Sequence, residues 1–300
     1  MIRRISSDMV VVFWASHKCP RPKAHAAFDA EGLADMLPAI DFYASIKDTA
    51  QHIVESSGIK AHGRVEFRGL SHDRNAVGVE ARRLIKGAKK NALPFLFSIG
   101  AVSGDDDDIS KVSVEVLECD PTLCPEIAQN RFHIEPTATN HFHNQCAFIT
   151  ANDLTNAITA MIKSCHGFLL RDGGILWYMP EDMIGPYVRI AEALEPYGVK
   201  MQTLRFDPVV NDSLVSHVCE ELERRSMAIF QGMIDEAMEM HARGAKPRSN
   251  GQQTRLELWI ETEATIQHNK HLLGKAFVKL SKAAQAAKEA IGAEAVKAFQ

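Results

Sequence analysis

The chain has 300 residues, of which 46% are hydrophobic, so it carries enough apolar material for a sizeable buried core. Its formal net charge of −4 at pH 7 excludes a polybasic chain that binds nucleic acid along its whole length. The apolar run at 9–14 is too short for a signal peptide, and no stretch reaches the ~18 apolar residues of a membrane span. The six cysteines form no disulfide framework. We therefore expect a cytoplasmic protein with reduced thiols and no membrane partner.

The first half of the chain changes between helical and strand periodicity. Pro22 suits the first turn of a helix that ends before Pro38, and Gly58 ends a second helix. Beyond Gly58, polar and apolar residues alternate in two runs around a turn-forming segment, which predicts a β-hairpin. A continuous apolar run then predicts a central strand. In chain order we expect a strand at 10–14, helices at 22–37 and 42–56, and strands at 64–68, 76–85, 94–102, 111–117 and 131–134.

Residues 149–210 carry the signals of a small unit in the order helix–strand–strand–helix–strand. A capping-box pattern at 150–153 opens the first helix. The turn formers at 172–174 join two short apolar runs, which predicts a second β-hairpin. Pro180 starts another helix, and residues 199–206 return as a strand.

Residues 211–300 predict two long helices joined by one break. The segment 211–243 has no proline and repeats apolar residues at helical spacing, turn formers fill 244–251, and the helical period resumes at 252. Helices of about 33 and about 45 residues would be roughly 50 and 65 Å long, so we expect part of this hairpin to project. The apolar stripe is wider than a two-helix seam. It therefore indicates a third helix, either from the rest of the protein or from another subunit.

The predicted fold class is α+β. We expect an antiparallel, hairpin-rich body with a long C-terminal antiparallel helical hairpin. The expected domains are an α+β body at 1–148, the small unit at 149–210, and the helical hairpin at 211–300.

A projecting helical hairpin favours assembly over chemistry. Methionine packs adaptably and suits partner surfaces, and aromatic residues widen the stripe. We expect a non-enzymatic scaffold or adaptor with coiled-coil character, which forms a homo-oligomer or docks on a protein partner through this hairpin. The expected contact residues are Met227, Phe230, Met238, Trp259, Phe277 and Leu280.

A basic ribbon is the basis of the alternative function, nucleic-acid binding. Residues 60–90 carry nine basic and three acidic side chains, a local charge of +6 in a negative protein. A basic two-stranded ribbon can follow a phosphate backbone, with an affinity that falls steeply as salt rises. Acidic neighbours or an acidic subunit could equally neutralise such a face. The candidate residues are Arg64, Arg68, Arg74, Arg82, Arg83, Lys86, Lys89 and Lys90.

Two clusters have residue types that bind metals, but neither has a metal-binding pattern. The four aspartates at 105–108 lack the spacing, central glycine and terminal glutamate of a calcium loop, which indicates a solvated acidic loop. The zinc candidates are cysteines and histidines between residues 119 and 146. They lack the glycine of a zinc knuckle, and they are better explained as buried thiols and surface histidines. The chain also contains no G-x-S-x-G, P-loop or G-x-G-x-x-G motif. We therefore expect no cofactor and no enzyme activity. The weak zinc candidates are Cys119, Cys124, His141, His143 and Cys146.

Several short motifs carry a resemblance to a known family. They are Trp14 on a strand, Pro20-Arg21-Pro22 at a helix start, the stretch 172–180, the stretch 199–208, and Val215, Val218 and Glu221 in the following helix. In this order they resemble an uncharacterised bacterial and phage family of helical-hairpin proteins. Its members are sometimes encoded near MoxR-type AAA+ ATPases and von Willebrand A-domain proteins. The resemblance implies a non-catalytic role in a multiprotein system, with an AAA+ ATPase system as the partner, and supplies no catalytic residue.

Overall fold

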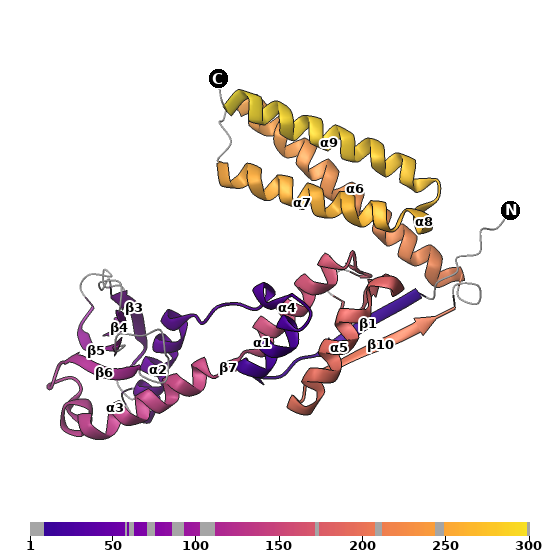
Figure 1. Ribbon diagram of the computed structural model, residues 1–300. Helices are drawn as coiled ribbons and strands as arrows, with labels where there is room; N and C mark the ends of the chain where they lie inside the picture. The colour runs from indigo at the N-terminus through magenta and orange to yellow at the C-terminus, as the bar shows by residue number, and fades with distance from the viewer. Residues whose placement is uncertain are drawn as a thin grey trace. The chain divides into compact units, whose positions relative to one another are not determined.

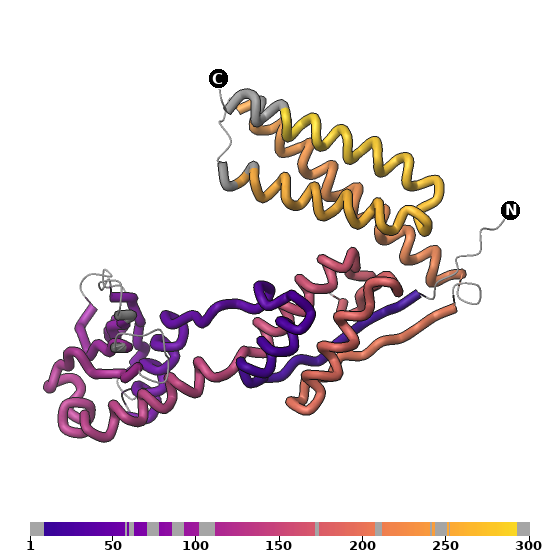
Figure 2. Tube along the Cα trace, viewed as in Figure 1, coloured from indigo at the N-terminus to yellow at the C-terminus, as the bar shows by residue number. Residues whose placement is uncertain are grey.

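The α+β fold class is confirmed, because the computed structural model contains both helices and antiparallel sheets (Figure 1). The expected domain ranges 1–148, 149–210 and 211–300 divide the chain in sequence order, whereas its contacts form two units that interleave along the chain (Figure 2). Unit 1 comprises residues 1–17, 25–37 and 151–300, and unit 2 comprises residues 18–24 and 38–150. The structure describes residues 9–57, 59, 63–70, 76–85, 93–102, 112–171, 174–207, 212–243 and 249–298.

Unit 2 is built on a four-stranded antiparallel sheet in the order β3-β4-β5-β6. The β-hairpin and the central strand that the alternating and apolar runs predict are both present. Buried side chains of β4, β5 and β6 pack with helices α2 and α3 in one hydrophobic core, which includes Val79, Phe97 and Phe142. The elements are β3 (Val65–Leu70), β4 (Ala76–Arg83), β5 (Phe95–Val102), β6 (Ser113–Cys119), α2 (Phe42–Ser56) and α3 (Pro125–Cys146).

The strand predicted at 131–134 is wrong, because these residues lie inside α3. Pro125 occupies the first turn of this helix, where the missing N–H costs nothing. Arg131 and Glu135 form an ion pair at 2.7 Å across one helical turn. Four residues are too few for periodicity to separate a strand from a helix. Non-helical angles at Asn130 further interrupt the helical pattern.

Side chains of α3 also cover the outer edge of the unit 2 sheet. The β6 backbone N–H groups of Val114 and Val116 donate hydrogen bonds to Thr139 Oγ1 and Glu135 Oε1, each at 2.9 Å. An outer strand with unpaired backbone groups invites pairing with another chain, so these two bonds protect β6. A short additional pair joins β2 (Cys19–Pro20) to β7 (Phe148–Ile149).

Unit 1 contains a second antiparallel sheet in the order β10-β1-β9-β8. All seven residues of β1 pair with β10, and residues 10–12 pair with β9 on the other side. Residues 9–12 are buried, as expected of an interior strand between helices. The Tyr187 hydroxyl on α5 donates to the Phe13 carbonyl at 2.8 Å and ties that helix to the sheet. The elements are β1 (Met9–Ala15), β8 (Phe168–Leu169), β9 (Trp177–Met179), β10 (Lys200–Phe206), α4 (Ala151–Ser164) and α5 (Gly185–Leu194), together with residues 25–29 of α1 (Arg21–Asp29), whose first turn belongs to unit 2.

The C-terminal region of unit 1 is helical as predicted, but its second helix is not continuous. It breaks at Asn269 and again at Gly274, whose φ of 49° lies in the left-handed region that favours glycine. The last helix therefore turns back and runs beside the first two (Figure 1). The third helix that the wide stripe required comes from this same segment of the chain. The helices are α6 (Asp212–Arg243), α7 (Ser249–His268), α8 (Lys270–Leu273) and α9 (Ala276–Ala298).

Candidate functional site

Three of the expected contact residues lie in the core of the C-terminal bundle. Phe230 and Leu280 are fully buried, and Trp259 is 8% exposed. The Trp259 indole N–H donates to the Ala284 carbonyl of α9 at 2.8 Å, and the Lys288 ammonium lies 5.0 Å from the ring centroid. These side chains hold α6, α7 and α9 together. They are therefore removed from the candidate contact surface, because the third helix of the same chain covers them.

The other three expected contact residues retain some exposure. Met238 on α6 is 58% exposed, whereas Met227 and Phe277 are partly buried against the bundle core. Met227 and Met238 lie eleven residues apart, which places them on the same flank of α6. The structure thus leaves an accessible methionine flank on α6 without joining it to the buried aromatic residues.

The sequence analysis missed an exposed apolar stripe on α7. Leu256 is 45% exposed and Ile260 is 52% exposed, and Ala264, which is partly buried, follows at the same four-residue spacing. Residues four apart share one face of a helix, so these three form a line that is centred about 100° around the helix from Trp259. We call Leu256, Ile260 and Ala264 the α7 stripe. The signal was present in the sequence, because α7 carries apolar residues on two faces, as a helix covered on both sides does.

Acidic side chains border the α7 stripe on both sides. By helical geometry Glu257 and Glu261 lie along one flank, and Glu263 lies along the other. Arg255 is the single Lys or Arg residue within α7. It is buried, and its Nη1 lies 3.3 Å from Glu236 Oε1 of α6. The outward face of α7 is therefore apolar in the middle and acidic at its edges.

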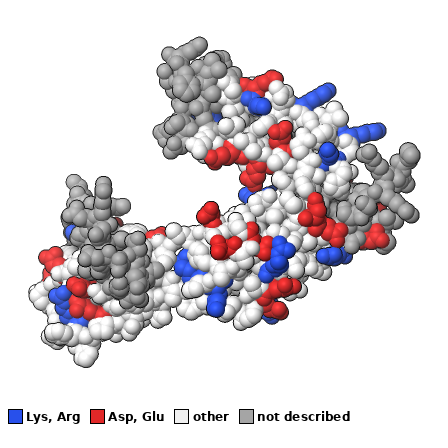
Figure 3. Space-filling model, viewed as in Figure 1, with Lys and Arg blue, Asp and Glu red and all other residues white. Residues whose placement is uncertain are grey.

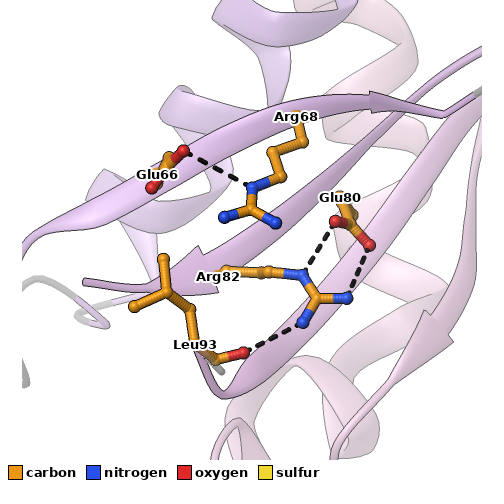
Figure 4. Close-up of polar contacts among 5 residues, drawn as sticks. All are labelled: Glu66, Arg68, Glu80, Arg82 and Leu93. Carbon is orange, nitrogen blue, oxygen red and sulfur yellow. Dashed lines mark hydrogen bonds and ion pairs between the residues drawn. The ribbon is translucent and has the colours of Figure 1, made fainter. Parts of the chain in front are cut away.

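In the described part of the predicted basic ribbon, two of the arginines lie beside glutamates. Glu66 pairs with Arg82, and Arg68 pairs with Glu80, in the register of β3 and β4. Within each strand the charges also meet, because Arg82 Nε lies 2.8 Å from Glu80 Oε1 and Arg68 Nε lies 3.4 Å from Glu66 Oε1 (Figure 4). Arg82 Nη1 also donates to the Leu93 carbonyl at 2.9 Å. Two glutamates thus neutralise two arginines on this face.

The remaining ribbon candidates are separated from that group. Arg64 is exposed just before β3, and Arg83 lines a cleft of about 280 Å³ together with apolar residues such as Val65 and Leu96. On the face drawn in Figure 3, acidic and basic side chains are interspersed over the described surface. The candidates Arg74, Lys86, Lys89 and Lys90, and the aspartates at 105–108, lie outside the described residues.

The weak zinc candidates do not gather into one site. The Cys119 thiol lies 3.6 Å from the Cys124 carbonyl oxygen, so these two cysteines are neighbours. The other candidates lie on α3. His141 contacts Asp48 Oδ2 at 3.0 Å, and His143 contacts the Val112 carbonyl at 2.8 Å. Cys146 is buried on the same helix. Within the part of the chain that the structure describes, no three His, Cys, Asp or Glu residues are grouped to hold a metal ion.

Comparison with family models, with curated proteins and with solved structures gives no match to this chain. The resemblance to the helical-hairpin family stays a prediction that rests on its short motifs. Among the helices described here, none is long and apolar enough to cross a membrane.

A histidine pair connects the end of α4 to the end of α7. The rings of His166 and His268 stack with centroids 4.7 Å apart, and His268 Nε2 lies 3.3 Å from Asp182 Oδ1. Burial lowers the pKa of His166, and the nearby charge of His268 lowers it further, against the opposing effect of Asp182. His166 has a φ of 59°, and the fully buried Asn269 donates to its carbonyl at 3.2 Å. This junction therefore favours the neutral form of the His166 imidazole.

Proposed function

We propose that the chain is a non-enzymatic assembly or adaptor protein whose contact surface is the α7 stripe. The observation that carries this proposal is the exposure of Leu256 and Ile260 on a helix whose buried face already closes the bundle core. Isolated exposed apolar residues are normal on protein surfaces. A line of them at helical spacing, bordered by charge, is typical of a helix-docking surface.

The acidic border specifies the chemistry of the partner. Glu257, Glu261 and Glu263 surround the stripe, so a complementary segment carries Lys or Arg beside its own apolar residues. We infer that the partner presents a basic amphipathic helix, which lies along α7 and covers Leu256 and Ile260. The AAA+ ATPase system that the family resemblance implies stays a prediction about the source of such a helix.

The chemistry of the cysteines supports a non-enzymatic role. Burial raises the pKa of the Cys165 thiol, and burial together with neighbouring charges raises the pKa of Cys124 to about 12. A thiolate, rather than a thiol, is the nucleophile in cysteine catalysis. These thiols are therefore core residues that are poorly suited to attack a substrate.

The test uses a synthetic amphipathic helix as the probe. A fluorescent peptide with leucines on one face and lysines on both flanks is titrated with the full-length protein, and anisotropy gives the Kd. We expect saturable binding that weakens as salt rises, because the flanking charges are exposed. Ile260→Lys should raise the Kd by more than tenfold. A peptide of the same pattern with glutamates in place of lysines should not bind.

Ala228→Lys is the matched control, since it introduces the same charge at an exposed position of α6. It should leave the Kd within about twofold of the wild-type value. Equal losses in both variants would show that general charge, rather than the α7 stripe, attracts the peptide. Absence of binding to the wild-type protein would overturn the proposal.

Nucleic-acid binding, the alternative, receives no support from the described face of the ribbon, because Arg68 and Arg82 are paired with Glu66 and Glu80. The same titration with a fluorescent DNA duplex serves as its test. Binding that Arg82→Glu abolishes would favour this alternative over docking on α7.

A further inference from the structure

The outer strand β10 of unit 1 has an open edge. All seven residues of β10 pair with β1 on one side, and within the described residues no strand lies on the other. In an antiparallel strand every second residue directs its N–H and C=O away from a given neighbour. Several backbone groups of β10 therefore face outward, and such an edge is a ready template for another strand.

The other outer strands are β3, β6 and β8, and the last two are protected. The edge of β6 is covered, because Thr139 and Glu135 accept its outward N–H groups. The outer strand β8 has two residues, a length that offers little to pair with. The β10 edge is seven residues long and has neither form of protection among the described residues.

A groove runs beside the open edge, between β10 and α5. Its volume is about 450 Å³. Val188, Ala191 and Met201 give it an apolar floor, and Glu192 and Glu195 are exposed on its helical side. We call Glu192 and Glu195 the α5 rim. An additional strand beside β10 would direct alternate side chains into this groove.

The strand that fits this groove is β10 itself. Its sequence Lys-Met-Gln-Thr-Leu-Arg-Phe has two basic and no acidic residues, which complements the acidic α5 rim. Arg205 is 55% exposed, and although it holds Glu181 at 3.0 Å, a guanidinium has five donors and can bind a second carboxylate. Leu204 is 46% exposed on the opposite face of β10. A second copy of the strand would cover part of it.

We propose that the chain forms a two-fold symmetric dimer in which β10 pairs antiparallel with β10 of a second copy. The surface is its own partner, as a two-fold interface requires. Thr203 is the central residue of the seven, so the axis passes beside it and each Thr203 lies opposite its copy. In this register Met201 lies opposite Arg205 of the second copy, and that arginine faces the α5 rim.

The first experiment measures the molar mass of the protein in solution and tests whether dimer formation depends on the α5 rim. Light scattering on a size-exclusion column should give twice 33.2 kDa for the wild-type protein at high concentration. Glu192→Lys with Glu195→Lys should weaken the dimer at least tenfold, because two cations would then face Arg205. The matched control is Glu115→Lys with Glu118→Lys, which makes the same charge change on exposed positions of β6 and should leave the dimer intact.

The second experiment tests the register with a short thiol-specific cross-linker. Thr203→Cys should give a cross-linked dimer, because residues directly opposite in an antiparallel pair have Cβ atoms about 5 Å apart. Lys200→Cys should not, because residue 200 lies opposite Phe206, which leaves its own copy about 20 Å away. The unmodified protein, with its native cysteines, controls for background.

Three results would overturn the proposal: a monomer at every concentration, a dimer that the rim variant leaves unchanged, or equal cross-linking at positions 200 and 203. The outcome is separable from that of the proposed function. A dimer lost in Ile260→Lys but retained in the rim variant would place self-association on α7 instead of β10.

Discussion

Replacement of Trp259 by alanine tests whether this residue closes the bundle core, as the structure shows, or forms a contact with a partner. The side chain is 8% exposed, so nearly all of its apolar surface is removed from water. A loss of about 180 Å² at ~25 cal/mol per Å² corresponds to about 4.5 kcal/mol, within the usual ~3–5 kcal/mol for a buried Trp→Ala change. Loss of the indole bond to Ala284 adds about 0.5–1 kcal/mol.

Urea unfolding followed by far-UV circular dichroism measures this loss. Because the chain has two units, the relevant quantity is the free energy of the transition that includes the C-terminal helices. Trp259→Phe should cost about 1–2 kcal/mol, since it retains most of the ring volume and removes the N–H donor. Leu256→Ala is the matched control on the same helix, and its 45% exposure predicts a loss below about 1 kcal/mol. If Trp259→Ala left stability within about 0.5 kcal/mol of wild type but reduced association, the core assignment would be wrong.

Three further predictions concern other parts of the chain. The free energy of unfolding should fall as pH drops from 7.5 to 5.5, because His166 has a lowered pKa in the folded state and the unfolded chain therefore takes up its proton first, near pH 6.5. His166→Asn should flatten this pH dependence, which urea midpoints measure. Arg82→Ala should destabilise unit 2 by about 1–2 kcal/mol, because it removes bonds to Glu80 and to the Leu93 carbonyl, and hydrogen exchange of β3 and β4 would report the loss. Ellman's reagent should react slowly with the folded protein, because the buried Cys124 has its pKa raised to about 12, and quickly with all six thiols in urea. Rapid reaction of four or more thiols in the folded protein would contradict the burial of the cysteines.

Much of the fold was predictable because many elements have clear local signals. The β-hairpin of β3 and β4 follows from alternating residues around a turn, and α2 follows from a periodic stretch between Asp41 and Gly58. Asp41 caps that helix by accepting the Ala44 N–H at 2.8 Å. The interior place of β5 follows from its continuous apolar run, as is typical of a strand with neighbours on both sides.

The break at Gly274 was harder to predict because the residues around it are good helix formers. One glycine inside a periodic stretch costs a helix only about 1 kcal/mol, so it does not by itself indicate an end. Here packing decides the outcome, because a turn at Gly274 lets Leu280 and Ala284 face Phe230 and Trp259 in one core. A single continuous helix would have left those side chains in water. Tertiary contacts therefore determine the break, and local propensity does not reveal it.

The turn at Gly274 also explains why three core residues of the bundle, Phe230, Trp259 and Leu280, were expected on a contact surface. A wide apolar stripe shows that a third helix is needed but does not show which chain supplies it. Once α9 covers Trp259, the apolar residues that stay exposed on α7 include Leu256 and Ile260. To separate the two faces of α7 from the sequence, each residue must be given an angle around the helix axis. The face that contains the largest aromatic side chain is then assigned to the core.

Docking on α7 and pairing through β10 would reinforce each other. A two-fold dimer through β10 carries two α7 stripes, and a partner with two basic helices could engage both. Its second contact would then form at an effective concentration set by the linker, which can raise the apparent affinity by about 10²–10⁴ without any new contact. The rim variant Glu192→Lys with Glu195→Lys should therefore leave the Kd of a single peptide unchanged and weaken binding of a tandem peptide. If the variant weakened both equally, the two surfaces would not be independent.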